Sequence, residues 1–130
     1  MTQPTVWPAL RFDDAPAAIR IIVDVFGFRE ALVVPGEGGH VQHAELRWPE
    51  GGGVMLGSTK CTDGTHADMK PGVNAVYVVT DDVDAVHDRV TKAGLDIDEP
   101  LHDTEFGSHT FTARDPEGNQ WTFGTYRGAP

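Results

Sequence analysis

Apolar residues in the first third of the chain recur every three or four positions between residues 19 and 26. This spacing predicts an amphipathic helix with one buried face. Asp14 precedes the helix and Gly27 follows it, and both are residue types typical of those positions. A short apolar segment comes before the helix and three strand-like segments come after it, at residues 7–12, 31–34, 41–48 and 53–57. The pattern therefore predicts the order β-α-β-β-β.

The second half of the chain repeats this order. A Val-rich segment is followed by a helix that begins at Asp81 and Asp82 and ends at Gly94. The expected strands of this half are residues 74–80, 96–98, 109–114 and 120–126. An offset of 67 residues brings two Arg-x-Pro-Glu-Gly turns together, residues 47–51 and 114–118, and also aligns Gly27 with Gly94. We predict one α+β domain, residues 1–130, of two pseudo-symmetric β-α-β-β-β modules at about 5–58 and 72–127, with a linker near 59–72.

Strict alternation in residues 43–48 assigns faces to the sheets. The apolar side chains should pack under the helix, and the polar ones, such as Glu45, should face the other way. We expect Trp121 and Phe123 to join the core. The opposite faces of two curved sheets should line a cleft that binds a ligand. The expected ligand-binding residues are Trp7, Ala9, Glu45, Arg47, Met55, Asn74, Val76, Thr110, Thr112 and Thr122.

Charge and composition exclude several classes of function. Ten basic and twenty acidic residues give a formal charge of −10, which argues against nucleic-acid binding. No apolar run is long enough to span a membrane, and the N-terminus lacks the pattern of a signal peptide. Cys61 is the only cysteine, so we expect no disulfide within the chain and a cytoplasmic location.

Several motifs together resemble the vicinal oxygen chelate superfamily, in particular its glyoxalase/bleomycin resistance/dioxygenase group. They are the repeated β-α-β-β-β order, Asp-Asp-Val-Asp at residues 81–84, Gly-Phe at 27–28 and Asp-Pro-Glu-Gly-Asn at 115–119. The resemblance extends over about residues 7–126. It implies the paired-module fold, which hosts lyases, isomerases, dioxygenases, thiol transferases and drug-binding proteins.

Enzymes of the superfamily hold a divalent metal with four side chains, usually His and Glu, from the first and last strand of each module. By this resemblance the four positions here are Trp7, Met55, Asn74 and Thr122. None is histidine or a carboxylate, and thioether, indole and hydroxyl groups are poor ligands for Mg, Mn, Ni or Fe. A shift of one residue replaces Asn74 with Ala75, which is no better. We therefore expect no metal at these positions and no cofactor.

His43 and Glu45 are the best remaining candidates for chemistry, because alternation places them on one face of a strand. They could form an acid–base pair, or contribute to a displaced metal site with His109 as a third ligand. The plainer interpretation is a polar, wet wall of the cleft.

We hypothesise that the protein binds a small molecule without a metal, and that it sequesters an aromatic antibiotic or another drug-sized organic ligand. The resemblance to drug-sequestering proteins further implies a homodimer. The alternative is a lyase, isomerase or dioxygenase that uses a rearranged metal or the pair His43 and Glu45. A third hypothesis is a domain with no tight natural ligand that serves a larger assembly.

Overall fold

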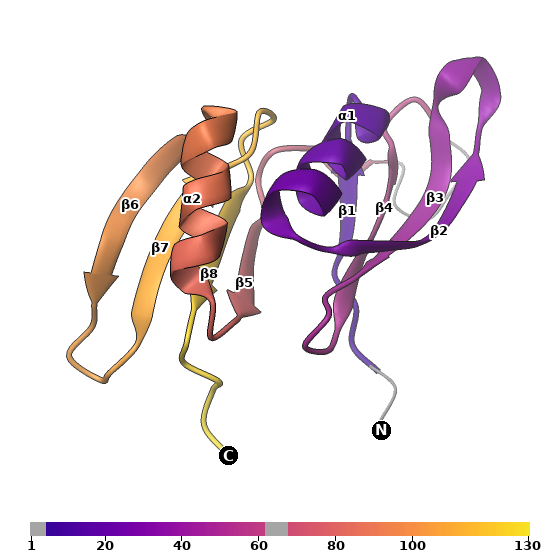
Figure 1. Ribbon diagram of the computed structural model, residues 1–130. Helices are drawn as coiled ribbons and strands as arrows, with labels where there is room; N and C mark the ends of the chain where they lie inside the picture. The colour runs from indigo at the N-terminus through magenta and orange to yellow at the C-terminus, as the bar shows by residue number, and fades with distance from the viewer. Residues whose placement is uncertain (1–4, 62–67) are drawn as a thin grey trace. The chain divides into compact units, whose positions relative to one another are not determined.

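The computed structural model describes residues 5–61 and 68–130, which form two compact units, Met1–Gly72 and Val73–Pro130 (Figure 1). The predicted linker, residues 59–72, includes residues 62–67, which lie outside the described residues. Among the described residues, no helix is both long and apolar enough to cross a lipid bilayer. Each unit is described below by itself.

The first unit has one four-stranded sheet with the strand order β1-β4-β3-β2. Strand β1 pairs in parallel with β4, and the other neighbouring strands pair antiparallel. The elements are β1 (Ala9–Phe12), α1 (Ala15–Arg20), η1 (Ile21–Phe26), β2 (Arg29–Pro35), η2 (Glu37–Gly39), β3 (Val41–Arg47) and β4 (Gly53–Ser58). The sheet begins at Ala9, two residues later than the sequence pattern predicts.

The second unit has the same topology, with the strand order β5-β8-β7-β6. Its elements are β5 (Ala75–Val79), α2 (Val83–Ala93), β6 (Asp96–Asp103), β7 (His109–Arg114) and β8 (Gln120–Gly124). The prediction of an α+β fold made of two β-α-β-β-β modules is confirmed.

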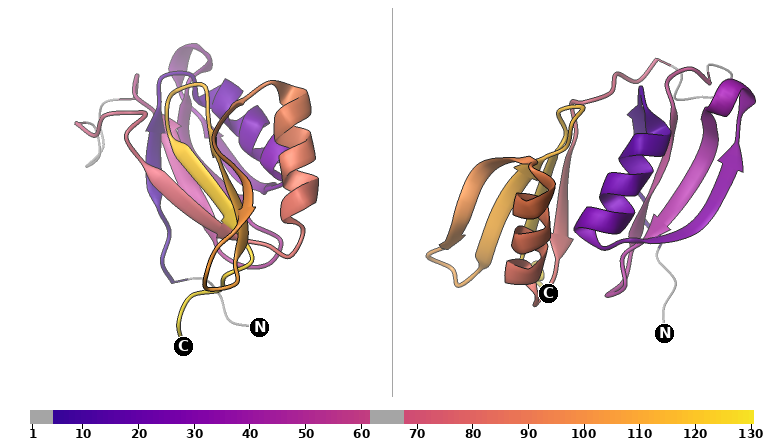
Figure 2. Two further views of the ribbon diagram at one scale, coloured as in Figure 1. Left: turned by 90° about the vertical axis from the view of Figure 1, so that its left-hand side faces the viewer. Right: turned by 45° about the horizontal axis from the view of Figure 1, so that its top comes forward.

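In each unit the helix packs on one face of its own sheet (Figure 2). In the second unit, the His87 ring on α2 meets Phe111 on β7 at 5.0 Å between centroids, and Phe111 stacks on Phe123 of β8 at 5.5 Å. Trp121 is fully buried, as predicted. Because alternate residues of a strand share a face, these contacts fix which side of the sheet is core. The opposite side of each sheet is called its open face below.

The helix of the first unit contains one residue more than α2. Asp14 and Asp82 are the corresponding N-caps, 68 residues apart, whereas the left-handed C-caps Gly27 and Gly94 are 67 apart. The π-helical turn η1 absorbs the extra residue, since the Gly27 amide donates to the Ile22 carbonyl five residues back at 3.2 Å. The offset of 67 residues, which would pair Asp14 with Asp81, is therefore wrong by one residue at the start of the helix.

Asp115 organises the turn between β7 and β8. Its two carboxylate oxygens accept four hydrogen bonds of 2.9–3.0 Å, from the amides of Glu117 and Asn119, the Asn119 side chain and Trp121 Nε1. The Asp115 side chain is buried, so the four donors replace the water that its charge would otherwise need. An offset of 67 residues places Trp48 at the corresponding position of the first unit.

We predict that Asp115→Ala lowers the free energy of unfolding by about 3 kcal/mol or more, because it leaves buried donors unpaired. Urea unfolding followed by circular dichroism measures the change. The control is Asp88→Ala on the exposed side of α2, for which a change below about 0.5 kcal/mol is expected. An equal effect of the two substitutions would contradict this role of Asp115.

His109 joins the start of β7 to two other elements of the second unit. Its Nε2 lies 2.7 Å from Asp84 of α2, and its Nδ1 lies 2.7 Å from Asp103 of β6. Only the protonated imidazole donates from both nitrogens. The hydrogen bond with Asp84, followed by the one with Asp103, raises the pKa of His109 above its ordinary value.

A raised pKa in the folded state means that the His109 contribution to stability is complete below the pKa of the unfolded chain. It is lost as the pH rises through the folded-state pKa. We therefore predict that His109→Ala destabilises the protein more at about pH 5.5 than at about pH 8.5. The two losses of stability should differ by up to about 1 kcal/mol, because solvent screens these exposed ion pairs. Urea unfolding at both pH values tests this. Asp88→Asn should leave the pH dependence unchanged, and an equal loss at both pH values for His109→Ala would refute the prediction.

Candidate functional site

The open face of the first unit brings together three predicted site residues. Ala9 and Glu45 both pair with Met55, which stands between them on the central strand β4. Paired residues point to the same side of a sheet, so these three side chains lie next to one another. Met55 and Glu45 are half-buried, and Ala9 is exposed.

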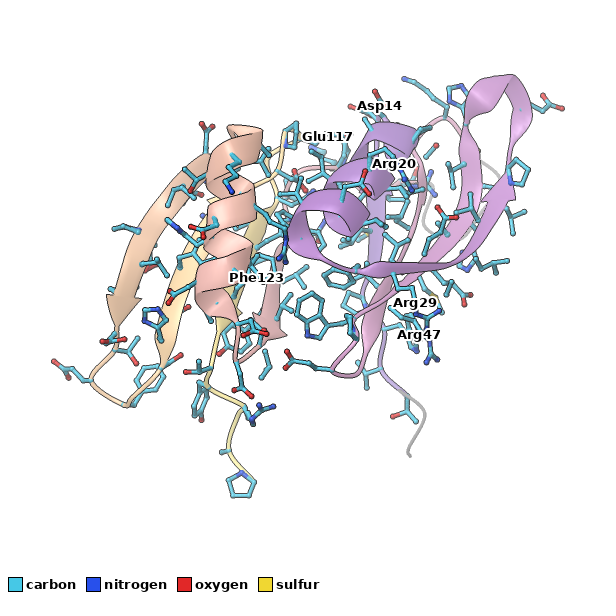
Figure 3. The ribbon with its side chains drawn as sticks, in the orientation of Figure 1. Asp14, Arg20, Arg29, Arg47, Glu117 and Phe123 are labelled. Atoms are coloured by element: carbon cyan, nitrogen blue, oxygen red, sulfur yellow. The ribbon has the colours of Figure 1, made fainter. Side chains whose placement is uncertain are left out.

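Trp7 lies over the end of this face, next to Arg47. A Cβ added at Gly53 would lie 2.7 Å from the Trp7 ring, so the absent side chain makes room for the indole. The Arg47 guanidinium carbon is 5.5 Å from the ring centroid, within the range of a cation–π contact. Arg29 pairs with Arg47, and Figure 3 shows the two arginines close together, where β2 begins and β3 ends.

Two exposed apolar side chains of the edge strand β2 extend this face. Leu32 pairs with Glu45 and is 44% exposed, and Val34 pairs with His43 and is 39% exposed. Sequence reasoning recognised a strand at residues 31–34 but did not assign its faces. The alternation of Leu32 and Val34 was the available signal.

His43 and Glu45 form the expected pair on the open face. His43 Nε2 lies 2.8 Å from Glu45 Oε2, and both side chains are part-exposed. The carboxylate can orient the imidazole, so the geometry suits proton transfer to or from a bound molecule. His109, the proposed third member of a displaced metal site, belongs to the second unit and is held by Asp84 and Asp103.

The open face of the second unit carries hydroxyl groups that mostly bond within the protein. Thr110 Oγ1 donates to the Phe123 carbonyl at 2.8 Å, and the hydroxyls of Thr112 and Thr122 lie 2.7 Å apart. Tyr77 pairs with Thr122 and is 45% exposed, and its hydroxyl donates to the Tyr126 carbonyl at 2.6 Å. Sequence reasoning missed Tyr77 because it placed β5 one residue out of register.

Two predicted site residues do not lie on the open face. Val76 pairs with Trp121, which belongs to the core, so Val76 faces the helix side. The backbone amide and side-chain amide of Asn74 both donate to Asn119 Oδ1, at 3.1 and 3.4 Å, so Asn74 joins the turn that Asp115 organises. The 67-residue offset caused both errors, because β1 and β5 correspond with an offset of 68.

The corrected register also decides whether the four metal-ligand positions fit a metal. Ala9 pairs with Met55 as Tyr77 pairs with Thr122, so the residue that corresponds to Trp7 is Ala75. An indole, a thioether, a methyl group and a hydroxyl already paired with Thr112 offer no ligand set for a hard divalent ion. Within residues 5–61 and 68–130, no cluster of three His, Cys, Asp or Glu side chains is arranged to hold a metal. The residues present do not fit the metal of the enzymes.

A sequence profile of the Glyoxalase/Bleomycin resistance protein/Dioxygenase superfamily matches residues 5–123. The chain belongs to this superfamily. It is similar to TioX from Micromonospora sp. ML1, with 33% identity and a TM-score of 0.79 over 95% of this chain and 98% of TioX. TioX and this chain therefore share the same fold.

Two further solved structures of the same fold differ in what their names say they do. Lactoylglutathione lyase from Agrobacterium tumefaciens is 25% identical, with a TM-score of 0.68 over 93% of each chain. TnmS3 from Streptomyces sp. CB03234, an antibiotic binding protein, is 23% identical, with a TM-score of 0.69 over 95% of this chain and 96% of TnmS3. One fold thus serves catalysis and binding, so function depends on the side chains that the sheets present.

We predict that Gly53→Ala lowers the free energy of unfolding by about 2 kcal/mol or more, because its Cβ would meet both the Leu46 carbonyl and the Trp7 ring. The double variant with Trp7→Ala should lose less than the sum of the single losses, since one of the two obstacles is gone. Urea unfolding of the four proteins of this cycle measures the coupling. Strict additivity would show that Trp7 does not lie over Gly53.

Proposed function

We propose that the protein binds a drug-sized organic molecule with an aromatic part on its open faces, without a metal. The observation that carries this proposal is that the four metal-ligand positions hold Trp7, Met55, Ala75 and Thr122, while the first open face exposes apolar side chains. Soluble proteins that expose neighbouring apolar groups beside a few polar ones commonly bind ligands there.

The chemistry of the first open face supports an aromatic ligand. Trp7 offers a rigid ring and Met55 an adaptable thioether, and both make favourable contacts with aromatic groups. Leu32 and Val34 add exposed apolar surface. Glu45 and His43 supply polar groups that would orient the bound molecule.

An antibiotic is the ligand class we favour, since the antibiotic binding protein TnmS3 shares this fold. The proposal includes a homodimer, as the resemblance to drug-sequestering proteins implies, and a cytoplasmic location, which is the expectation for a chain with a single cysteine. Light scattering coupled to gel filtration tests the dimer, and a mass of one chain, 14.1 kDa, would contradict it.

Quenching of tryptophan fluorescence by doxorubicin, tetracycline and metal-free bleomycin tests the binding function. We expect at least one of the three to bind in chelator-treated buffer, and Trp7→Ala to weaken that binding about tenfold through loss of aromatic contact. The matched control is Trp48→Phe. Trp48 contacts the buried Phe28 at 5.0 Å between centroids, and it follows Arg47, so alternation turns its side chain to the helix side. Its replacement should therefore leave the affinity unchanged.

Two results would contradict the proposal. One is the absence of saturable binding for all three antibiotics. The other is binding that Trp7→Ala leaves unchanged while Trp48→Phe weakens it, which would place the ligand on the helix side of the sheet.

A second candidate function rests on the hydrogen bond of 2.8 Å between His43 and Glu45. It is a metal-independent lyase or isomerase that moves a proton with this pair. S-Lactoylglutathione, the compound in the name of the lyase of the same fold, is a suitable probe. Turnover that persists with EDTA and disappears in Glu45→Gln would favour the enzyme over the binding protein, and no turnover would dismiss it for this substrate.

A further inference from the structure

A cavity of about 200 Å³ opens on the first open face. Arg11 and His43 line it from either side, and Gly57 and Met55 lie between them on β4. A Cβ added at Gly57 would lie 3.8 Å from Arg11 Nη1, so the missing side chain leaves the hollow beside the guanidinium open. The cavity is therefore built within one unit and is bordered by a cationic group.

Only part of the hydrogen-bond donors of the Arg11 guanidinium bond to described residues, although Arg11 is only 8% exposed. Nη2 makes both hydrogen bonds that the group forms with described residues, to the carbonyls of Ser58 and Cys61, each at 2.8 Å. Nε is buried and has no acceptor among the residues that the structure describes. No carboxylate of residues 5–61 and 68–130 lies within ion-pair distance of Arg11. A buried cation whose donors are only partly matched is costly unless another group pairs with it.

The surrounding face is cationic although the whole chain carries a charge of −10. Arg29 and Arg47 pair with each other across β2 and β3 on this side of the sheet. Glu45 lies two residues before Arg47 on the same face of β3 and forms a hydrogen bond with His43. Three arginines thus stand against one glutamate among these charged side chains of the open face, in contrast to the net charge of the molecule, and Arg11 is the cation that borders the cavity.

We propose that Arg11 is the polar anchor of this cavity and that the bound molecule carries an anionic oxygen, a carboxylate or an ionised phenol, which accepts hydrogen bonds from Nη1. The inference rests on the proposed function and narrows it to aromatic acids. The acidic group occupies the hollow over Gly57, and the ring system extends over Met55 toward Trp7. Charge-assisted hydrogen bonds of a guanidinium are stronger than neutral ones, so the acidic group selects the ligand.

Naphthalene-2-carboxylate and naphthalene-2-carboxamide test the proposal, because they share ring and shape and differ in charge. Calorimetry at neutral pH should show that the carboxylate binds about tenfold more tightly or better. In parallel, ¹⁵N NMR follows the Arg11 Nε–H signal, which should shift with the carboxylate and stay in place with the carboxamide. The NMR measurement uses the unmodified protein, so it stands even where an Arg11 variant fails to fold.

Arg11→Gln should bring the ratio of the two affinities close to one. The matched control is Arg20→Gln, which also removes one positive charge but lies on the helix, where Arg20 pairs with Glu30 at 3.1 Å, and should keep the ratio. Equal affinities in the unmodified protein, an unchanged ratio in Arg11→Gln, or no binding of either compound would overturn the inference. Antibiotic binding together with equal affinities for the acid and the amide would overturn the role of Arg11 alone and leave the proposed function standing.

Discussion

Each four-stranded sheet must bury one of its faces under a single short helix, and the rest of the structure follows from this constraint. Because side chains alternate along a strand, burying one face places the intervening side chains on the other. Phe123 and Trp121 belong to the buried face, and Thr122 between them belongs to the open one. A shift of one residue therefore moves a side chain from the open face to the core, as it does for Val76.

The extra residue in the first helix shows how a local change of backbone sets the chemistry of a distant position. The π-helical turn accommodates one additional residue between the N-cap Asp14 and the C-cap Gly27 of the first unit. The two halves consequently correspond with one offset before this turn and another after it. That difference places Ala75, and not Asn74, opposite Trp7 in the repeat, and it removes a polar group from the face where the enzymes of the superfamily bind metal.

Sequence periodicity was sufficient to predict the fold. The helical spacing at residues 19–26, the alternation at residues 43–48 and the repeated turns each fixed an element, and the core positions Trp121 and Phe123 followed from them. The candidate site was less accessible. Tyr77 became visible only when strand pairing showed which side it faces, since a single strand does not reveal its partners. Alternation with Ala9 places Arg11 on the open face, but its burial and its hydrogen-bond partners became known only from the structure.

The same sheet architecture can support catalysis or binding, and what decides between them here is the set of side chains on the open faces. That these faces act without a metal is tested most directly by elemental mass spectrometry of untagged protein purified without chelators. The structure predicts less than about 0.1 equivalent of any transition metal, because the four positions offer no suitable ligands. A content close to one equivalent of a single metal would contradict it.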